Sequence, residues 1–86
     1  MIREYLISSN DYSVERIESC NEFVDKFNRM AKFDSYFGRI KENPKNGIIT
    51  QILKFKNCTF YIKCDDYEDL EKLYDNIIER RYLYDK

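Results

Sequence analysis

The chain has 86 residues, of which 43% are hydrophobic and 36% are charged, and its formal net charge is −1. This length suits one domain with a small core, and the balance of apolar and charged residues is typical of a globular protein and excludes a fully disordered chain. The N-terminal segment is too charged for a signal peptide, and no apolar run reaches the ~18 residues of a membrane span. We therefore expect a single domain over residues 1–86, located in the cytoplasm.

The N-terminal part of the chain predicts a strand followed by a long helix. Residues 2–7 are short and apolar, which is typical of a strand. Residues 8–13 are rich in helix-capping side chains, and apolar residues then recur at steps of three and four from Val14 to Ala31. This spacing predicts an amphipathic helix over residues 12–32, with charged side chains on its opposite face.

The segment after this helix leaves its structure open. Residues 36–42 fit a short strand with Gly38 at a bend or bulge, but the pattern does not decide between a strand and a loop. Residues 42–47 predict a turn, because Pro44 disfavours a helical conformation at Asn43 and the pair Asn46-Gly47 suits positive φ angles.

Residues 47–55 and 58–64 alternate between two sets of side chains, which predicts a β-hairpin. With Lys56-Asn57 as the turn, Leu53 lies opposite Phe60; a turn at Asn57-Cys58 would change the partners but not the faces. One predicted face carries Ile49, Gln51, Leu53, Phe55, Cys58, Phe60, Ile62 and Cys64. The other carries Ile48, Thr50, Ile52, Lys54, Thr59, Tyr61 and Lys63.

The last part of the chain predicts a second helix over residues 66–81. Apolar residues repeat there at helical spacing, and Asp65 with Glu68 three residues later resembles a capping box. Acidic residues at the start of this helix and Arg80-Arg81 at its end both fit the helix dipole. The predicted order is β-α-(β)-β-β-α, which indicates an α+β domain with three or four mainly antiparallel strands and both helices on one face.

The residue types argue against catalysis and against a metal site. The chain has no histidine, which removes the commonest general base. Cys58 and Cys64 lie six residues apart on one predicted strand, about 20 Å, which is too far for a disulfide or a shared zinc ion. The glycines at 38 and 47 are isolated, so no glycine-rich phosphate loop is present. We therefore expect a protein that is not an enzyme and holds no cofactor or metal ion.

The hairpin provides one candidate site, for nucleic acid. Residues 47–64 carry three lysines and no acidic residue. Basic residues around an aromatic side chain on an open sheet face can contact phosphates and stack on a base. The candidate residues for binding RNA or single-stranded DNA are Lys54, Lys56, Tyr61 and Lys63.

From residue 12 onward, the predicted order of one helix, three strands and a second helix resembles the double-stranded RNA-binding domain in outline. That family carries a basic KKxAK-type cluster at the start of its last helix, where this chain has DDYEDLEK at 65–72. The charge at the phosphate-binding position is therefore reversed. The resemblance concerns the order of the elements and does not imply RNA binding.

The last predicted helix and the tail provide the other candidate site, for a protein partner. Acidic side chains recur there at helical spacing, and Tyr and Arg, which are enriched where protein interfaces are strongest, follow in the tail. The candidate contacts are Glu68, Glu71, Asp75, Glu79, Arg81, Tyr82 and Tyr84. An acidic face of this kind can dock on a basic patch of another protein. A homodimer through an open sheet edge or through the tail is compatible with either function.

The composition, rich in Ile, Lys, Asn and Tyr, fits AT-rich coding sequences such as those of low-GC bacteria and their phages, and also those of some eukaryotes. Together with the absence of catalytic and metal-binding patterns, this favours a small cytosolic accessory protein. We expect it to bind a host or rival protein as an inhibitor or modulator, encoded by a phage or mobile element. Binding of nucleic acid through the hairpin is the alternative.

Overall fold

A computed structural model describes the backbone of residues 1–9 and 13–84, and the side chains of residues 1–9 and 13–79. Its elements, in chain order, are β1 (Ile2–Ser9), β2 (Val14–Ile17), α1 (Cys20–Phe33), β3 (Tyr36–Lys41), β4 (Ile49–Phe55), β5 (Cys58–Cys64) and α2 (Tyr67–Tyr84). Neither helix is long and apolar enough, over the described residues, to cross a membrane.

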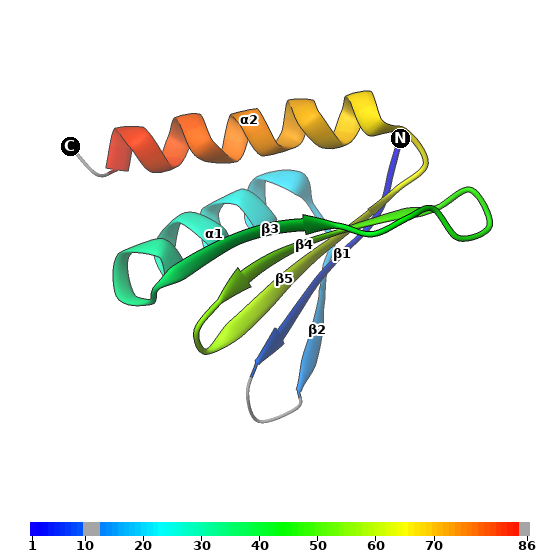
Figure 1. Ribbon diagram of the computed structural model, residues 1–86. Helices are drawn as coiled ribbons and strands as arrows, with labels where there is room; N and C mark the ends of the chain where they lie inside the picture. The colour runs from blue at the N-terminus through cyan, green and yellow to red at the C-terminus, as the bar shows by residue number, and fades with distance from the viewer. Residues whose placement is uncertain (10–12, 85–86) are drawn as a thin grey trace.

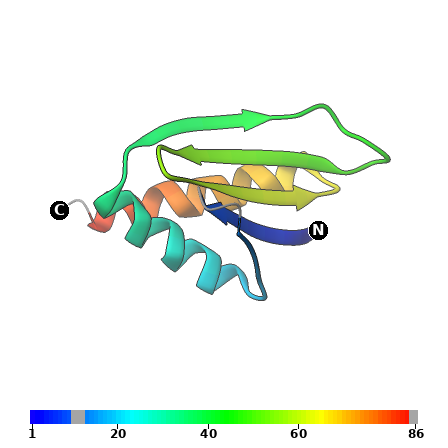
Figure 2. The ribbon, with the colours of Figure 1, turned by 90° about the horizontal axis from the view of Figure 1, so that it is seen from below.

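The five strands form one antiparallel sheet in the order β2-β1-β5-β4-β3 (Figures 1 and 2). Both helices cover the same face of this sheet, and they also contact each other. We call the face under the helices the inner face and the opposite one the outer face. The α+β class is confirmed, whereas the prediction of three or four strands is corrected to five.

The extra strand is β2, which occupies a segment that the helical spacing assigned to the first helix. The helix begins at Cys20, because the side chain of Ser19 caps it by accepting a hydrogen bond from the backbone N–H of Glu22 at 3.1 Å. Before the cap, Val14–Ile17 pairs with β1. The predicted start of the helix at residue 12 is therefore wrong, and its end at Phe33 lies within one residue of the prediction.

Residues 36–41 do form a strand, which settles the alternative that the sequence left open. The pairing of β3 with β4 shifts between Tyr36 and Gly38, and Gly38 has a φ of +123°, as expected for a bulge that only glycine adopts easily. The predicted turn is confirmed by Asn46 and Gly47, both with positive φ, between the bridged residues Lys45 and Ile48.

The β4–β5 hairpin has the predicted register, with Leu53 opposite Phe60. All eight residues of the predicted inner-facing set are at most 5% exposed. In α2 the predicted cap is corrected by one residue: Asp66 accepts a hydrogen bond from the N–H of Glu68 at 2.9 Å, while Asp65 forms an ion pair with Arg3 at 2.6 Å. The helix continues to Tyr84 instead of ending at 81.

The core lies between the inner face and the two helices. Its centre is an aromatic cluster of Phe23 and Phe27 from α1 with Phe55 and Phe60 from the hairpin, whose contacting ring centroids are 5.0–5.5 Å apart. The helix α2 adds Leu70, Leu73 and Ile77. Large aromatic side chains bury much area per residue, which a core of this size needs.

Candidate interaction surface

The outer face is organised as rows of side chains that run across the strands. One row, which we call the central row, takes one residue from each of the five strands. In antiparallel sheets, directly paired residues place their side chains on the same face. The pairing of the strands gives this row, in order, as Arg16, Leu6, Tyr61, Ile52 and Ile40.

Two polar rows flank the central row. The first, which we call the Lys54 row, consists of Val14, Ser8, Thr59, Lys54 and Gly38. The second, the Lys63 row, consists of Glu4, Lys63, Thr50 and Glu42, the last joined to its neighbour by a backbone hydrogen bond of 2.9 Å to Thr50. The outer face therefore has an apolar centre between polar margins.

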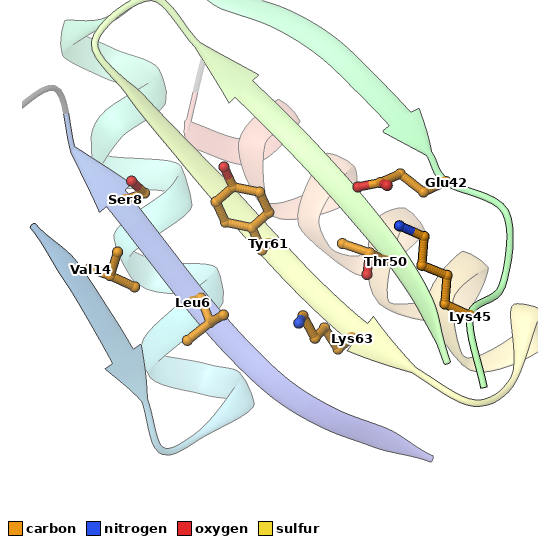
Figure 3. A pocket seen from close by; sticks show the side chains of 8 residues that line it. All are labelled: Leu6, Ser8, Val14, Glu42, Lys45, Thr50, Tyr61 and Lys63. Atoms are coloured by element: carbon orange, nitrogen blue, oxygen red, sulfur yellow. The ribbon is translucent and has the colours of Figure 1, made fainter. Parts of the chain in front are cut away.

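No helix covers this apolar centre. Figure 3 shows Leu6 and Tyr61 on the side of the sheet opposite to both helices. Ile40 is 57% exposed, while Leu6, Ile52 and Tyr61 are half-buried.

A hollow of about 440 Å³ lies on the same face (Figure 3). Its walls come from β1, β2, β4 and β5 and from the β3–β4 connection. The lining residues are Leu6, Ser8, Val14, Glu42, Lys45, Thr50, Tyr61 and Lys63. The hollow makes the face concave enough to receive side chains from another molecule.

The outer face carries charges of both signs. The cations are Arg16, Lys45, Lys54 and Lys63, and the acids are Glu4 and Glu42. Within the described part of the chain, none of these six side chains takes part in an ion pair. Their charges are therefore available for contacts with a partner.

The structure brings together most of the candidate residues for nucleic acid. Lys54 and Lys63 lie in the two rows on either side of Tyr61, on one face. Lys56 lies apart in the β4–β5 turn, where its backbone N–H donates to the carbonyl oxygen of Ser35. Because Glu42 shares a row with Lys63, the face lacks the uniformly positive potential that is typical of nucleic-acid sites.

The candidate acidic residues of α2 do not form one uniform surface. Glu71 contacts β3: its carboxylate lies 2.7 Å from Nζ of Lys41 and 3.2 Å from the guanidinium of Arg39. These partners, Lys41 above all, lower the pKa of Glu71. Arg39 also stacks on the ring of Tyr74, 3.9 Å from its centroid. Glu71 therefore helps to fasten α2 to the sheet.

The other candidates on α2 are separate from this contact. Glu68 pairs with Lys72 at 3.2 Å one helical turn away, and Asp75 and Glu79 are exposed. Arg81, Tyr82 and Tyr84 belong to the last turns of the helix, but their side chains lie outside the described residues.

The cysteines are placed as core side chains. All three are free, and Cys58 and Cys64 are buried. Burial, followed by the nearby carboxylate of Asp34, raises the pKa of Cys58 to about 11, which opposes formation of a reactive thiolate. Over the residues whose side chains are described, no group of three or more His, Cys, Asp or Glu is placed to hold a metal ion.

Sequence reasoning missed most of the central row. It placed Tyr61 and Ile52 on the outer face of the hairpin, but it did not connect them with Leu6, Arg16 or Ile40. The alternation within β4 and β5 was a sufficient signal for the faces of these two strands, whereas the row needs the order and register of all five strands. Comparison of the chain with protein-family models, with curated proteins and with solved structures finds no match.

Proposed function

We propose that this protein acts by binding a protein partner through the outer face of its sheet, and that it inhibits or modulates that partner without catalysis. The observation that carries the proposal is the uncovered central row, in which Leu6, Tyr61 and Ile52 are adjacent on the three middle strands. An apolar centre with a polar margin is the usual anatomy of a protein interface.

The energetic argument rests on what these side chains gain from a partner. Removal of apolar surface from water contributes about 25 cal/mol per Å². The inner face has already obtained this gain, because the helices cover it, whereas the centre of the outer face has not. Tyr61 lies in the middle strand of the sheet, and a tyrosine near the centre of an interface is a typical hot spot.

A variant pair tests this proposal. Tyr61→Glu places a carboxylate in the centre of the face, and Lys56→Glu places the same carboxylate outside it, in the adjacent turn, with a larger change of charge. Tagged wild-type protein and both variants are used for affinity capture from the cells that produce the protein. We expect one partner to be retained by the wild type and by Lys56→Glu and lost by Tyr61→Glu. Equal retention by all three contradicts the proposed surface.

Binding of RNA or single-stranded DNA is the second candidate function, supported by the position of Lys54 and Lys63 on either side of Tyr61. Fluorescence polarisation with a labelled oligonucleotide at two salt concentrations tests it, because phosphate contacts must weaken steeply as salt rises. Absence of binding at low salt removes this candidate.

The acidic candidates of α2 remain a second proposed region of partner contact, with Glu68, Asp75 and Glu79 as its exposed described members. The tail residues Arg81, Tyr82 and Tyr84 belong to the same proposal by sequence alone. A phage or mobile-element origin likewise remains a prediction from composition.

A further inference from the structure

The charges of the outer face are arranged so that the two edges of the sheet complement each other. Arg16 lies in edge strand β2, and Glu42 follows the opposite edge strand, β3. Four strand spacings separate these edges, roughly 19 Å, so the two side chains do not meet within one chain. In the middle of the sheet, Glu4 and Lys63 are directly paired on β1 and β5.

We infer that the partner of the outer face is a second copy of this chain, related by a two-fold axis that runs along β5 between the two sheets. The inference rests on the proposed function, because it names the partner that this face binds; the protein that is inhibited or modulated then contacts the dimer at another surface, for which α2 is the candidate. Such an axis places β2 of each copy opposite β3 of the other copy and β1 opposite β4. The two β5 strands face each other. Two sheets that pack face to face lie about 10 Å apart, with their strands within about 30° of each other.

This symmetry matches the apolar residues of the central row. Leu6 of each copy faces Ile52 of the other, and the two Tyr61 rings meet on the axis. Ile40 of each copy lies under the aliphatic part of Arg16 of the other copy. The exposed apolar side chain at one edge is therefore covered by the long side chain from the opposite edge.

The same symmetry pairs the charges. Arg16 of each copy lies one row from Glu42 of the other, a lateral offset of roughly 7 Å that two long side chains can span. Glu4 of each copy lies one strand from Lys63 of the other, and both acids flank the point where the two Lys63 side chains approach each other. Arg16 and Lys63 of each copy thereby gain acidic neighbours, whereas Lys54 faces Ser8 and Lys45 lies in the β3–β4 connection, so four cations against two acids leave this face with a net charge of +2 per copy.

The helical layers of both copies face outward in this arrangement. The exposed acidic residues of α2 then remain accessible on two opposite sides of the dimer. A further partner could contact them without displacing the second copy.

Light scattering coupled to size-exclusion chromatography tests the inference on the purified chain. One chain has a mass of 10.6 kDa, and we expect the wild-type protein to show twice this mass. Tyr61→Glu places two carboxylates against each other on the axis and abolishes the dimer. Arg16→Glu, at an exposed edge, places acid beside acid twice per dimer and raises the dimer dissociation constant about tenfold or more.

The double variant Arg16→Glu with Glu42→Arg makes the decisive comparison. It restores opposite charges between copies, so we expect the dimer to return to near wild-type strength. Within one chain the two positions are too far apart to interact, and rescue therefore reports contact between copies. Arg29→Glu, at an exposed position of α1, has the same charge change as Arg16→Glu and is the control that leaves the dimer intact.

Three results would overturn the inference: a wild-type monomer up to high micromolar concentration, a dimer that survives Tyr61→Glu, or a double variant as weak as Arg16→Glu alone. A monomer that captures a different protein through Tyr61 overturns the inference and leaves the proposed function standing. A monomer that captures no protein overturns both.

Discussion

Phe60 and Tyr61 are neighbours on β5, yet they lie in different environments. Phe60 is 1% exposed and contacts Phe23, Phe27 and Phe55 through its ring. Tyr61 is half-buried on the outer face, among side chains of the sheet alone. One strand therefore supplies both the centre of the core and the centre of an uncovered surface.

The comparison of the two faces distinguishes the residues that stabilise the fold from those that remain accessible to a partner. Every inner-facing residue of β4 and β5 is buried, so the core is complete without the outer face. A sheet with only one covered face usually alternates apolar with polar residues. The apolar side chains of Leu6, Ile52 and Tyr61 depart from that pattern together and in one row, which is why we assign them to binding.

Truncation of these two neighbours gives the largest predicted contrast. Phe60→Ala leaves a cavity in the aromatic cluster and should lower the free energy of unfolding by about 3–5 kcal/mol. Tyr61→Ala removes a side chain that no helix covers, and we expect a loss of about 1 kcal/mol. Urea denaturation at low protein concentration measures both. Equal losses would show that the outer face is part of the stabilising core.

Replacement of Gln51, the one amide on the inner face of β4, should have a smaller effect of opposite sign, because it should raise the free energy of unfolding. Gln51 is fully buried, and neither atom of its amide has a hydrogen-bond partner among the described residues. Gln51→Met keeps the volume and removes the desolvation cost, so we expect a gain of about 1–3 kcal/mol. Thr50→Val, next to it on the outer face, is the control and should change little. A loss of stability in Gln51→Met would mean that the amide is satisfied in solution.

The parts of the fold that could be predicted are those with local causes. The β4–β5 hairpin follows from alternation and from a two-residue turn within one short segment, and its register and faces are confirmed. The segment 14–17 was misassigned because Val14 and Ile17 fit helical spacing as well as a strand. Its strand partner is β1, a separate segment of the chain, and the capping pair Ser19 and Glu22 was the local signal that marks the true start of the helix.

The candidate surface shows the same division between local and non-local information. The outer positions of the hairpin were predicted residue by residue. The central row also needs the pairing of Leu6 with Tyr61, two residues more than 50 positions apart, and the bulge at Gly38 that sets the register of Ile40. Neither pairing follows from the periodicity of one segment. For the same reason, the spacing along α2 places Glu71 on an acidic face, whereas the structure pairs it with Lys41 and Arg39 on β3.

The ion pairs of Glu71 with Lys41 and Arg39 provide a third test, which uses the dependence of stability on pH. The depressed pKa of Glu71 means that its ion pairs with Lys41 and Arg39 stabilise the fold above the unfolded pKa of about 4.3, and that this contribution disappears as pH falls through the folded pKa. Because the side chain of Glu71 is 40% exposed, solvent screening limits the contribution to under about 1 kcal/mol.

We therefore expect Glu71→Gln to be slightly less stable than the wild type at pH 7 and equal to it near pH 3. Thermal unfolding of both proteins across this range measures the difference. The N-terminal amino group and Arg3 also lower the pKa of Asp65, but that group is present in both proteins and cancels. A difference that stays constant with pH would show that Glu71 acts through packing and not through its charge.

The exposed acids of α2 should have the smallest effect on stability, and they test whether a second surface binds a partner independently of the sheet. The triple variant Glu68→Gln, Asp75→Asn, Glu79→Gln keeps the ion pairs of Glu71 and loses only the solvent-exposed pair with Lys72, so its free energy of unfolding should stay within about 0.5 kcal/mol of the wild type. Its mass by light scattering should also be unchanged, because α2 faces away from the proposed dimer contact. If α2 contacts a further protein, the variant should nevertheless retain less of it in affinity capture. Full retention would end the proposal for α2 and leave the outer face as the remaining candidate surface.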